Sequence, residues 1–119
     1  MKYGINKATL VGNVGDTPKI NEKNGEIILA SFPFATSETY RDKNGEEVTA
    51  TQWHRIKVWN KRATVIRDYV KKGDSLYIEG KIVNNNWDDE EGNRRYSTEI
   101  ECDNFLFLRS KKPEEAVDQ

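Results

Sequence analysis

The sequence contains few of the residues that stabilise small proteins covalently or through metal ions. It has one cysteine and one histidine among 119 residues, which excludes an intrachain disulfide and a local cluster of soft metal ligands. Its apolar residues stand in short groups, none approaching the length of a membrane span. We therefore expect a soluble protein without a metal site. Cys102 continues an alternation with Ile100 and is interpreted as a small core residue.

The length of the chain predicts a single domain. A chain of 119 residues suits one hydrophobic core. Residues 1–6 contain no apolar stretch or cleavage site, so a cytoplasmic location is the default expectation. The apolar patterning ends at Leu108, so residues 1–108 are predicted to form the domain. The polar, patternless residues 109–119 are predicted to be a disordered tail.

The charges are nearly balanced in total but unevenly distributed. The formal net charge is −1, which by itself argues against a polyanionic partner. Between Trp53 and Lys72, however, seven cations stand against one acid, a local net charge of +6. Such a run is often only a solvated face, so it becomes informative when other residues support it.

The segment 51–59 supplies that support. In a strand, alternate residues share a face, and one face here would alternate rings with cations: Trp53, Arg55, Lys57 and Trp59. The opposite face would carry His54, Ile56 and Val58. Flat rings between cations can stack bases and neutralise the phosphates that join them. The alternative is a sheet covered on both faces, in which both indoles are buried and the two cations reach outward along their stems.

The order of elements favours a small barrel. Strand-like patterns cover residues 7–14, 27–36, 51–59, 75–83 and 96–108. Pro33 implies a bulge or an edge position in the second of them. A three- and four-residue spacing of Ala63, Ile66 and Val70 predicts one short helix over 61–72, ended by Gly73. Polar segments around residues 42–45 and 88–93 predict two projecting hairpins. This order is that of an OB-fold, an all-β, five-stranded, partly open Greek-key barrel with one short helix.

Five strings stand in order along about residues 5–108: Asn6–Asn13, Ala35–Glu38, Thr51–Arg55, Lys72–Gly80 and Gly92–Tyr96. Together, with this spacing, they resemble bacterial single-stranded DNA-binding proteins. The resemblance implies an OB-fold protomer in a homotetramer. Single-stranded DNA would wrap around it without sequence preference during replication, recombination and repair. It implies no catalysis and no cofactor, and a location in the cytoplasm with the nucleoid.

The resemblance also implies roles for particular residues. Base-stacking aromatics of the family match Tyr40, Trp53, Trp59 and Trp87. Basic positions near the DNA backbone match Arg55, Lys61, Lys72 and Arg95, to which the alternation of the aromatic strand adds Lys57. His54 falls where the family has a histidine near its subunit contact.

The chain departs from the family pattern in three places. Tyr40 stands where tryptophan is commoner, which should reduce the stacking area there. Residues 83–86 lack the cations that often precede the aromatic residue of the second hairpin, and four acids follow Trp87, so phosphate contact along that hairpin is in doubt. Residues 111–119 lack the family's long linker and acidic tip, so recruitment of replication and repair enzymes cannot be predicted.

Other functions stay open on the sequence alone. A dimeric primosomal accessory protein, or an RNA-binding module of the cold-shock kind, would use the same barrel. A nuclease would need convergent carboxylates, whereas Asp88, Asp89, Glu90 and Glu91 are consecutive in a turn and should point in several directions. A protein-interaction or sugar-binding barrel would have no use for the basic stretch.

Overall fold

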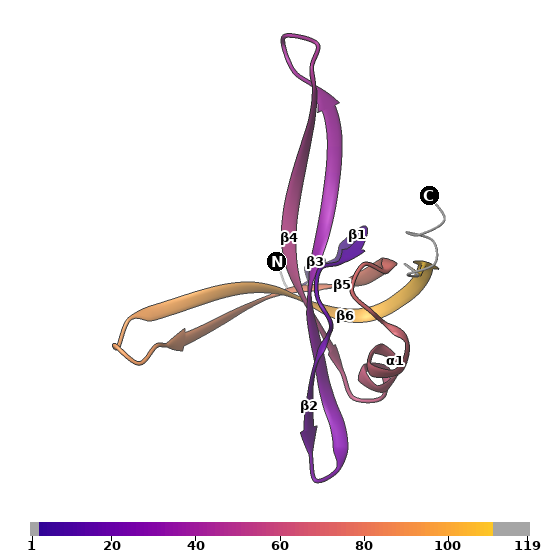
Figure 1. Cartoon of the computed structure of the whole chain (residues 1–119). Coiled ribbons are helices and arrows are strands. Elements are labelled where there is room, and N and C mark those ends of the chain that lie inside the picture. The colour runs from indigo at the N-terminus through magenta and orange to yellow at the C-terminus, as the bar shows by residue number, and fades with distance from the viewer. Residues whose placement is uncertain (1–2, 111–119) are drawn as a thin grey trace.

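A computed structural model describes residues 3–110 of the chain (Figure 1). The elements are β1 Ala8–Val14, β2 Lys19–Lys23, β3 Glu26–Arg41, β4 Glu47–Trp59, α1 Lys61–Tyr69, β5 Ser75–Asp88 and β6 Arg94–Arg109. The predicted tail lies outside the described residues except for Arg109, which ends β6, and Ser110.

Five of the six strands form a closed barrel. The strand order is β1-β5-β6-β4-β3-β2, and β1 also pairs with β3. That closing seam is short, with Asn13 opposite Ala35 and Val14 opposite Phe34. The β4 and β6 strands run parallel, while the other pairs are antiparallel. The predicted all-β barrel with one short helix is confirmed.

The barrel interior is filled by apolar side chains from every barrel strand. Phe32 and Phe34 meet edge to face with ring centroids 6.2 Å apart, a favoured geometry for aromatic pairs. The helix α1 buries Ala63 and Ile66 against β3 and β4. It ends three residues earlier than the sequence predicts, because Val70 is extended and Gly73 has a φ of 93°. Val70 still packs in the core, as its spacing predicted.

Two strand features differ from the prediction or extend it. The strand β2 was not predicted, because Ile20 is its only apolar residue and there is no alternation to detect. It forms by pairing with β3 through the reversal at Asn24 and Gly25. For Pro33 the sequence predicts a bulge or an edge position, and on this side of β3 it pairs with neither β1 nor β2. Its carbonyl accepts from Gly15 N–H at 2.8 Å, so its nitrogen faces the β1–β2 connection. No ladder bond to β4 is lost.

Both predicted hairpins are present as long arms. The β3–β4 and β5–β6 pairs continue beyond the barrel and run away from it in different directions (Figure 1). The same five-residue turn closes each arm, from Asp42 to Glu46 and from Asp89 to Asn93. In each turn one aspartate oxygen accepts two backbone N–H groups, which lie 2.8 to 3.0 Å away. Ile82 continues the alternation of the buried Leu76 and Ile78 but is exposed, because β5 is leaving the barrel there.

A bulge where β5 meets β6 changes the direction of the side chains on β6. Glu79 pairs with Asn104 and Gly80 with Cys102, which leaves Asp103 as the extra residue. Cys102 is buried in the core, as predicted, and burial raises the pKa of its thiol to about 11. Within residues 3–110 there is no cluster of three metal-ligating side chains and no helix long and apolar enough to cross a membrane.

Candidate nucleic-acid interface

The two tryptophans of β4 lie on the outer surface of the barrel. Trp53 is 63% exposed and Trp59 is 42% exposed, while Ile56 and Val58 between them are fully buried. The predicted alternation of faces is therefore confirmed, and the alternative of a strand covered on both sides is wrong. An indole left in water contributes little to folding, so this face is available for a ligand.

The Trp53 ring has a specific seat on the barrel. It lies over Gly15 and Pro33, so close that a methyl group built on Gly15 would come within 2.4 Å of the six-membered ring. The β1–β2 connection thus supports the indole because it presents no side chain at Gly15. A supported ring loses less conformational freedom when a base stacks on it.

The cations beside these rings are not equally available. Arg55 is exposed, whereas the side chain of Lys57 is only 20% exposed and its ammonium lies 3.0 Å from a carboxylate oxygen of the buried Glu99. The parallel pairing of β4 with β6 brings that acid beside the lysine. The predicted phosphate contact of Lys57 stays a prediction, and it would have to compete with this ion pair.

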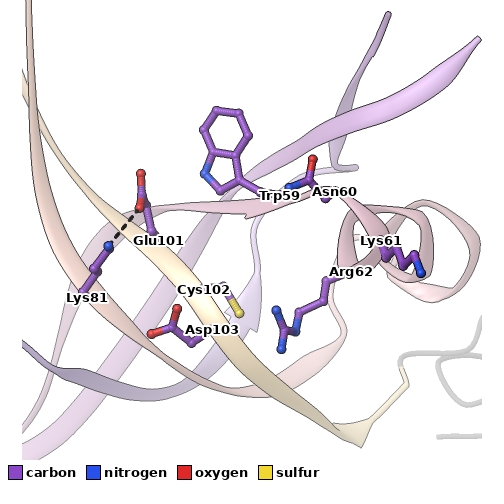
Figure 2. A pocket seen from close by; sticks show the side chains of 8 residues that line it. All are labelled: Trp59, Asn60, Lys61, Arg62, Lys81, Glu101, Cys102 and Asp103. Atoms are coloured by element: carbon purple, nitrogen blue, oxygen red, sulfur yellow. Dashed lines mark ion pairs between the residues drawn. The ribbon is translucent and has the colours of Figure 1, made fainter.

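A pocket of about 700 Å³ opens beside Trp59 (Figure 2). Its lining residues are Trp59, Asn60, Lys61, Arg62, Lys81, Glu101, Cys102 and Asp103. The start of α1 places Lys61 and Arg62 on one side, and β5 and β6 supply the other. Sequence reasoning selected Trp59 and Lys61 but missed Arg62 and Lys81 as site residues. Arg62 could have been found in the basic stretch, whereas Lys81 reaches the pocket only through the fold.

The other two predicted stacking residues lie on the arms. Tyr40 is exposed near the end of the β3–β4 arm, and Trp87 is exposed on the β5–β6 arm. Because the arms diverge, the four aromatics form separate stations rather than one pocket (Figure 1). Tyr96, which pairs with Asn86 next to Trp87, is a further exposed ring.

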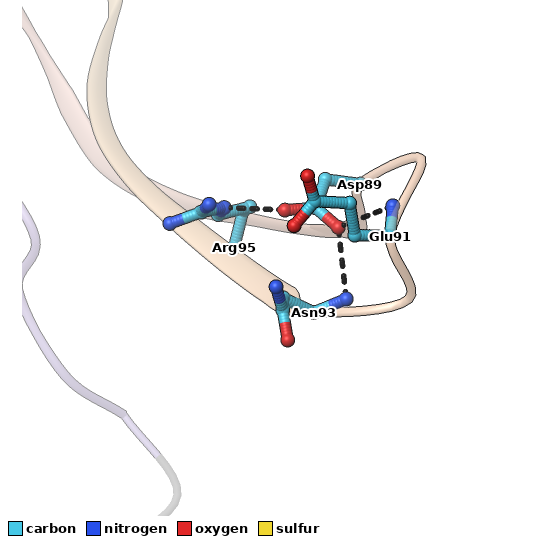
Figure 3. A network of polar contacts seen from close by, with 4 residues as sticks. All are labelled: Asp89, Glu91, Asn93 and Arg95. Atoms are coloured by element: carbon cyan, nitrogen blue, oxygen red, sulfur yellow. Dashed lines mark hydrogen bonds and ion pairs between the residues drawn. The ribbon is translucent and has the colours of Figure 1, made fainter.

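Arg95 is held by an acid of its own hairpin. Its Nε donates to Asp89 Oδ2 at 2.8 Å, while Asp89 Oδ1 accepts from the N–H groups of Glu91 and Asn93 (Figure 3). These bonds, led by the backbone N–H of Asn93, lower the pKa of Asp89. The doubt about phosphate contact on this hairpin therefore has a structural basis. The role of Arg95 stays a prediction.

The two remaining predicted residues lie away from this hairpin. Lys72 is exposed just after α1. His54 is half-buried, and one ring nitrogen lies 2.9 Å from Thr36 Oγ1. Its role at a subunit contact stays a prediction.

The closed five-stranded barrel, with its helix between the third and fourth barrel strands, defines the chain as an OB-fold protein with a candidate nucleic-acid face. It belongs to the single-strand binding protein family, whose model matches residues 5–108.

Two curated relatives support the family assignment. The chain is 38% identical over 112 residues to single-stranded DNA-binding protein 1 of Chlorobaculum tepidum, covering 93% of this chain and 69% of that protein. It is 44% identical over 107 residues to the single-stranded DNA-binding protein of Rhizobium meliloti strain 1021, covering 88% and 62%. The chain therefore spans less than two thirds of the second relative.

Solved structures agree with the fold. The Plasmodium falciparum SSB complex with ssDNA matches with a TM-score of 0.80 at 32% identity, covering 91% of this chain and 98% of that one. A deletion mutant of the single-stranded DNA binding protein from Thermus aquaticus matches with a TM-score of 0.76 at 20% identity, covering 93% and 54%. The second likeness concerns the fold alone.

Proposed function

We propose that the chain binds single-stranded DNA without sequence preference. The observation that carries this proposal is the outer face of β4, where Trp53 and Trp59 stand exposed on either side of Arg55 while Ile56 and Val58, on the opposite face, fill the core. Family membership and the likeness to a complex with single-stranded DNA support it. Every base has a flat face that an indole can stack, so such a surface tolerates any sequence.

The same residues suggest a path for the bound DNA strand. We propose that bases stack on Trp53 and Trp59 on the barrel, and on Tyr40 and Trp87 on the arms. Arg55, Lys61 and Lys72 would neutralise the phosphates, with Lys57 and Arg95 joining where their acidic partners can be displaced. Each good stack contributes about 1 to 3 kcal/mol.

Single strands should outcompete duplex, because a duplex hides the faces of its bases. Oligo-dT and duplex DNA of equal length would be titrated while tryptophan fluorescence is followed, and only the single strand should quench it strongly. The logarithm of the binding constant should fall with the logarithm of salt concentration, with a slope of about −0.7 per phosphate neutralised. Equal competition by duplex, or binding that ignores salt, would reject the proposal.

We further propose a homotetramer, supported by an exposed apolar row across three strands. Val11 on β1 pairs with Tyr77 on β5, which pairs with Leu106 on β6, and both aliphatic residues are more than half exposed. Beside the row, Tyr77 donates to Glu79 at 2.6 Å, which raises the pKa of the tyrosine, and Lys7 lies 3.5 Å from the same carboxylate.

Native mass spectrometry of the unmodified protein should give four times the protomer mass. The Leu106→Asp variant should give a smaller assembly, because the new charge would be buried in the subunit contact. Val65→Asp, on an exposed residue of α1, is the matched control and should leave the tetramer intact. A dimer in the unmodified protein would favour the primosomal accessory function instead.

The wider role is proposed on the same basis. Protection of single strands during replication, recombination and repair requires binding and no catalytic step. We therefore propose that the protein is not an enzyme, and that it acts in the cytoplasm where such strands arise. Residues 1–108 would be the DNA-binding domain. Incubating labelled single strands with Mg²⁺ or Mn²⁺ should leave them uncut.

A further inference from the structure

The pocket beside Trp59 contains two carboxylates for which stacking and phosphate contact have no use. Glu101 and Asp103 line it together with the cations Lys61, Arg62 and Lys81. A surface selected only for affinity toward a polyanion would avoid acids at this position, because they repel the phosphates. Within residues 3–110 their charge is offset only by a long ion pair between Glu101 and Lys81, with 3.8 Å between the charged atoms, which leaves acceptor positions for a ligand.

Both carboxylates can accept hydrogen bonds from a ligand. Glu101 Oε1 is 3.8 Å from Lys81 Nζ, which is beyond hydrogen-bond distance, and the side chain is 30% exposed. Asp103 is the extra residue of the β6 bulge and is exposed, and Figure 2 shows its carboxylate on the opposite side of β6 from the Trp59 ring. Figure 2 shows the Glu101 carboxylate rising on the same side of the strands as the Trp59 ring. A base stacked on that ring would therefore have an acceptor near its edge.

The phosphate of the same nucleotide has partners across the pocket. Lys61 and Arg62 are the first two residues of α1, a position where the helix dipole disfavours cations, and no acid stands in that turn. Arg62 forms no ion pair within residues 3–110. An anion bound here would pair with both cations and with the positive end of the helix.

We propose that this pocket binds one nucleotide of the strand and favours bases with an exocyclic amino group over thymine and uracil. The inference rests on the proposed function and adds a base preference at one station. Trp59 stacks the base, Lys61 and Arg62 hold the phosphate, and Glu101 accepts from the amino group.

The preference follows from the acceptor-only character of a carboxylate. Cytosine presents its N4 amino group as a donor, whereas thymine and uracil present the O4 acceptor in its place. With uracil, two acceptors would face each other beside a negative charge. Because the pocket is open to water and the other stations tolerate any base, the effect on a short strand should be modest, about threefold to tenfold.

Oligo-dC and oligo-dU of equal length separate this effect from stacking, since both bases are pyrimidines without a methyl group. Their affinities would be measured by fluorescence anisotropy of labelled strands. Glu101→Gln keeps the shape and adds a donor, so the ratio of dC to dU affinity should fall by about threefold or more. Asp103→Asn should leave the ratio nearly unchanged, because its carboxylate lies on the other side of β6.

The matched control is Glu47→Gln, an exposed acid on the β3–β4 arm. It removes the same charge, so it should raise both affinities alike and leave their ratio unchanged. A ratio that Glu101→Gln does not change would overturn the base preference while leaving the binding of single strands intact. Failure of both oligonucleotides to bind would instead reject the proposed function.

Discussion

Replacing Gly80 with alanine is expected to lower the melting temperature by about 10 to 25 °C, which corresponds to about 3 kcal/mol or more of stability. A methyl group on Gly80 would lie 2.1 Å from the carbonyl oxygen of Glu101 and 3.1 Å from the Cα of Cys102. Both obstacles are backbone, so no side chain can rotate away. The β5 and β6 strands would have to separate at the bulge, and barrel hydrogen bonds would be lost.

Thermal unfolding followed by circular dichroism measures this effect. Gly4→Ala is the matched control, since nothing lies within 4 Å of a methyl group there, and its melting temperature should stay close to that of the unmodified protein. A Gly80→Ala protein that melts within about 2 °C of the unmodified one, less than a typical destabilising substitution produces, would show that the strands separate at little cost.

Replacing Trp53 with alanine is expected to weaken binding of single-stranded DNA by about 5- to 150-fold, the loss of one stacking station. The ring is well exposed, so its removal should leave the barrel stable. Trp53→Phe should recover part of the affinity, because a smaller flat ring remains. Anisotropy of a labelled oligonucleotide is the suitable measurement, since it does not depend on the number of tryptophans.

Tyr69→Ala provides a control of equal exposure. Tyr69 is 64% exposed, against 63% for Trp53, but it lies on α1 rather than on the outer face of β4. Its replacement should change affinity by less than about twofold, as expected for a surface substitution away from the binding face. Equal losses in the two variants would mean that exposed rings matter wherever they lie, and the assigned face would be wrong.

Much of the fold could be predicted because its signals are local. The alternation in β4, the spacing of Ala63 and Ile66 in α1 and the glycine-containing turns of both arms each depend on neighbours in the chain. The strand β2 and the exposure of Ile82 depend on where distant strands pair or diverge. The periodicity of apolar residues in the sequence cannot reveal either feature.

The candidate site likewise has features that could be predicted from the sequence and features that could not. Exposure of Trp53 and Trp59 could be predicted, because their parity is opposite to that of buried neighbours. The ion pair between Lys57 and Glu99 could not be predicted, because the two residues are 42 positions apart in sequence and are brought together only by the parallel pairing of β4 with β6. The pocket beside Trp59 combines residues from β4, α1, β5 and β6. Only the fold brings its acids and cations together, so the sequence alone could not predict that they share one pocket.

The long arms make the protomer less compact than its length requires. Its radius of gyration is 17.0 Å, whereas a chain of this size usually folds to roughly 13 to 14 Å. Beyond the barrel each arm is a two-stranded ribbon, which has little independent stability. The amide hydrogens of each arm should therefore exchange with solvent through local opening that leaves the barrel folded. Single-stranded DNA bound along an arm would slow that exchange.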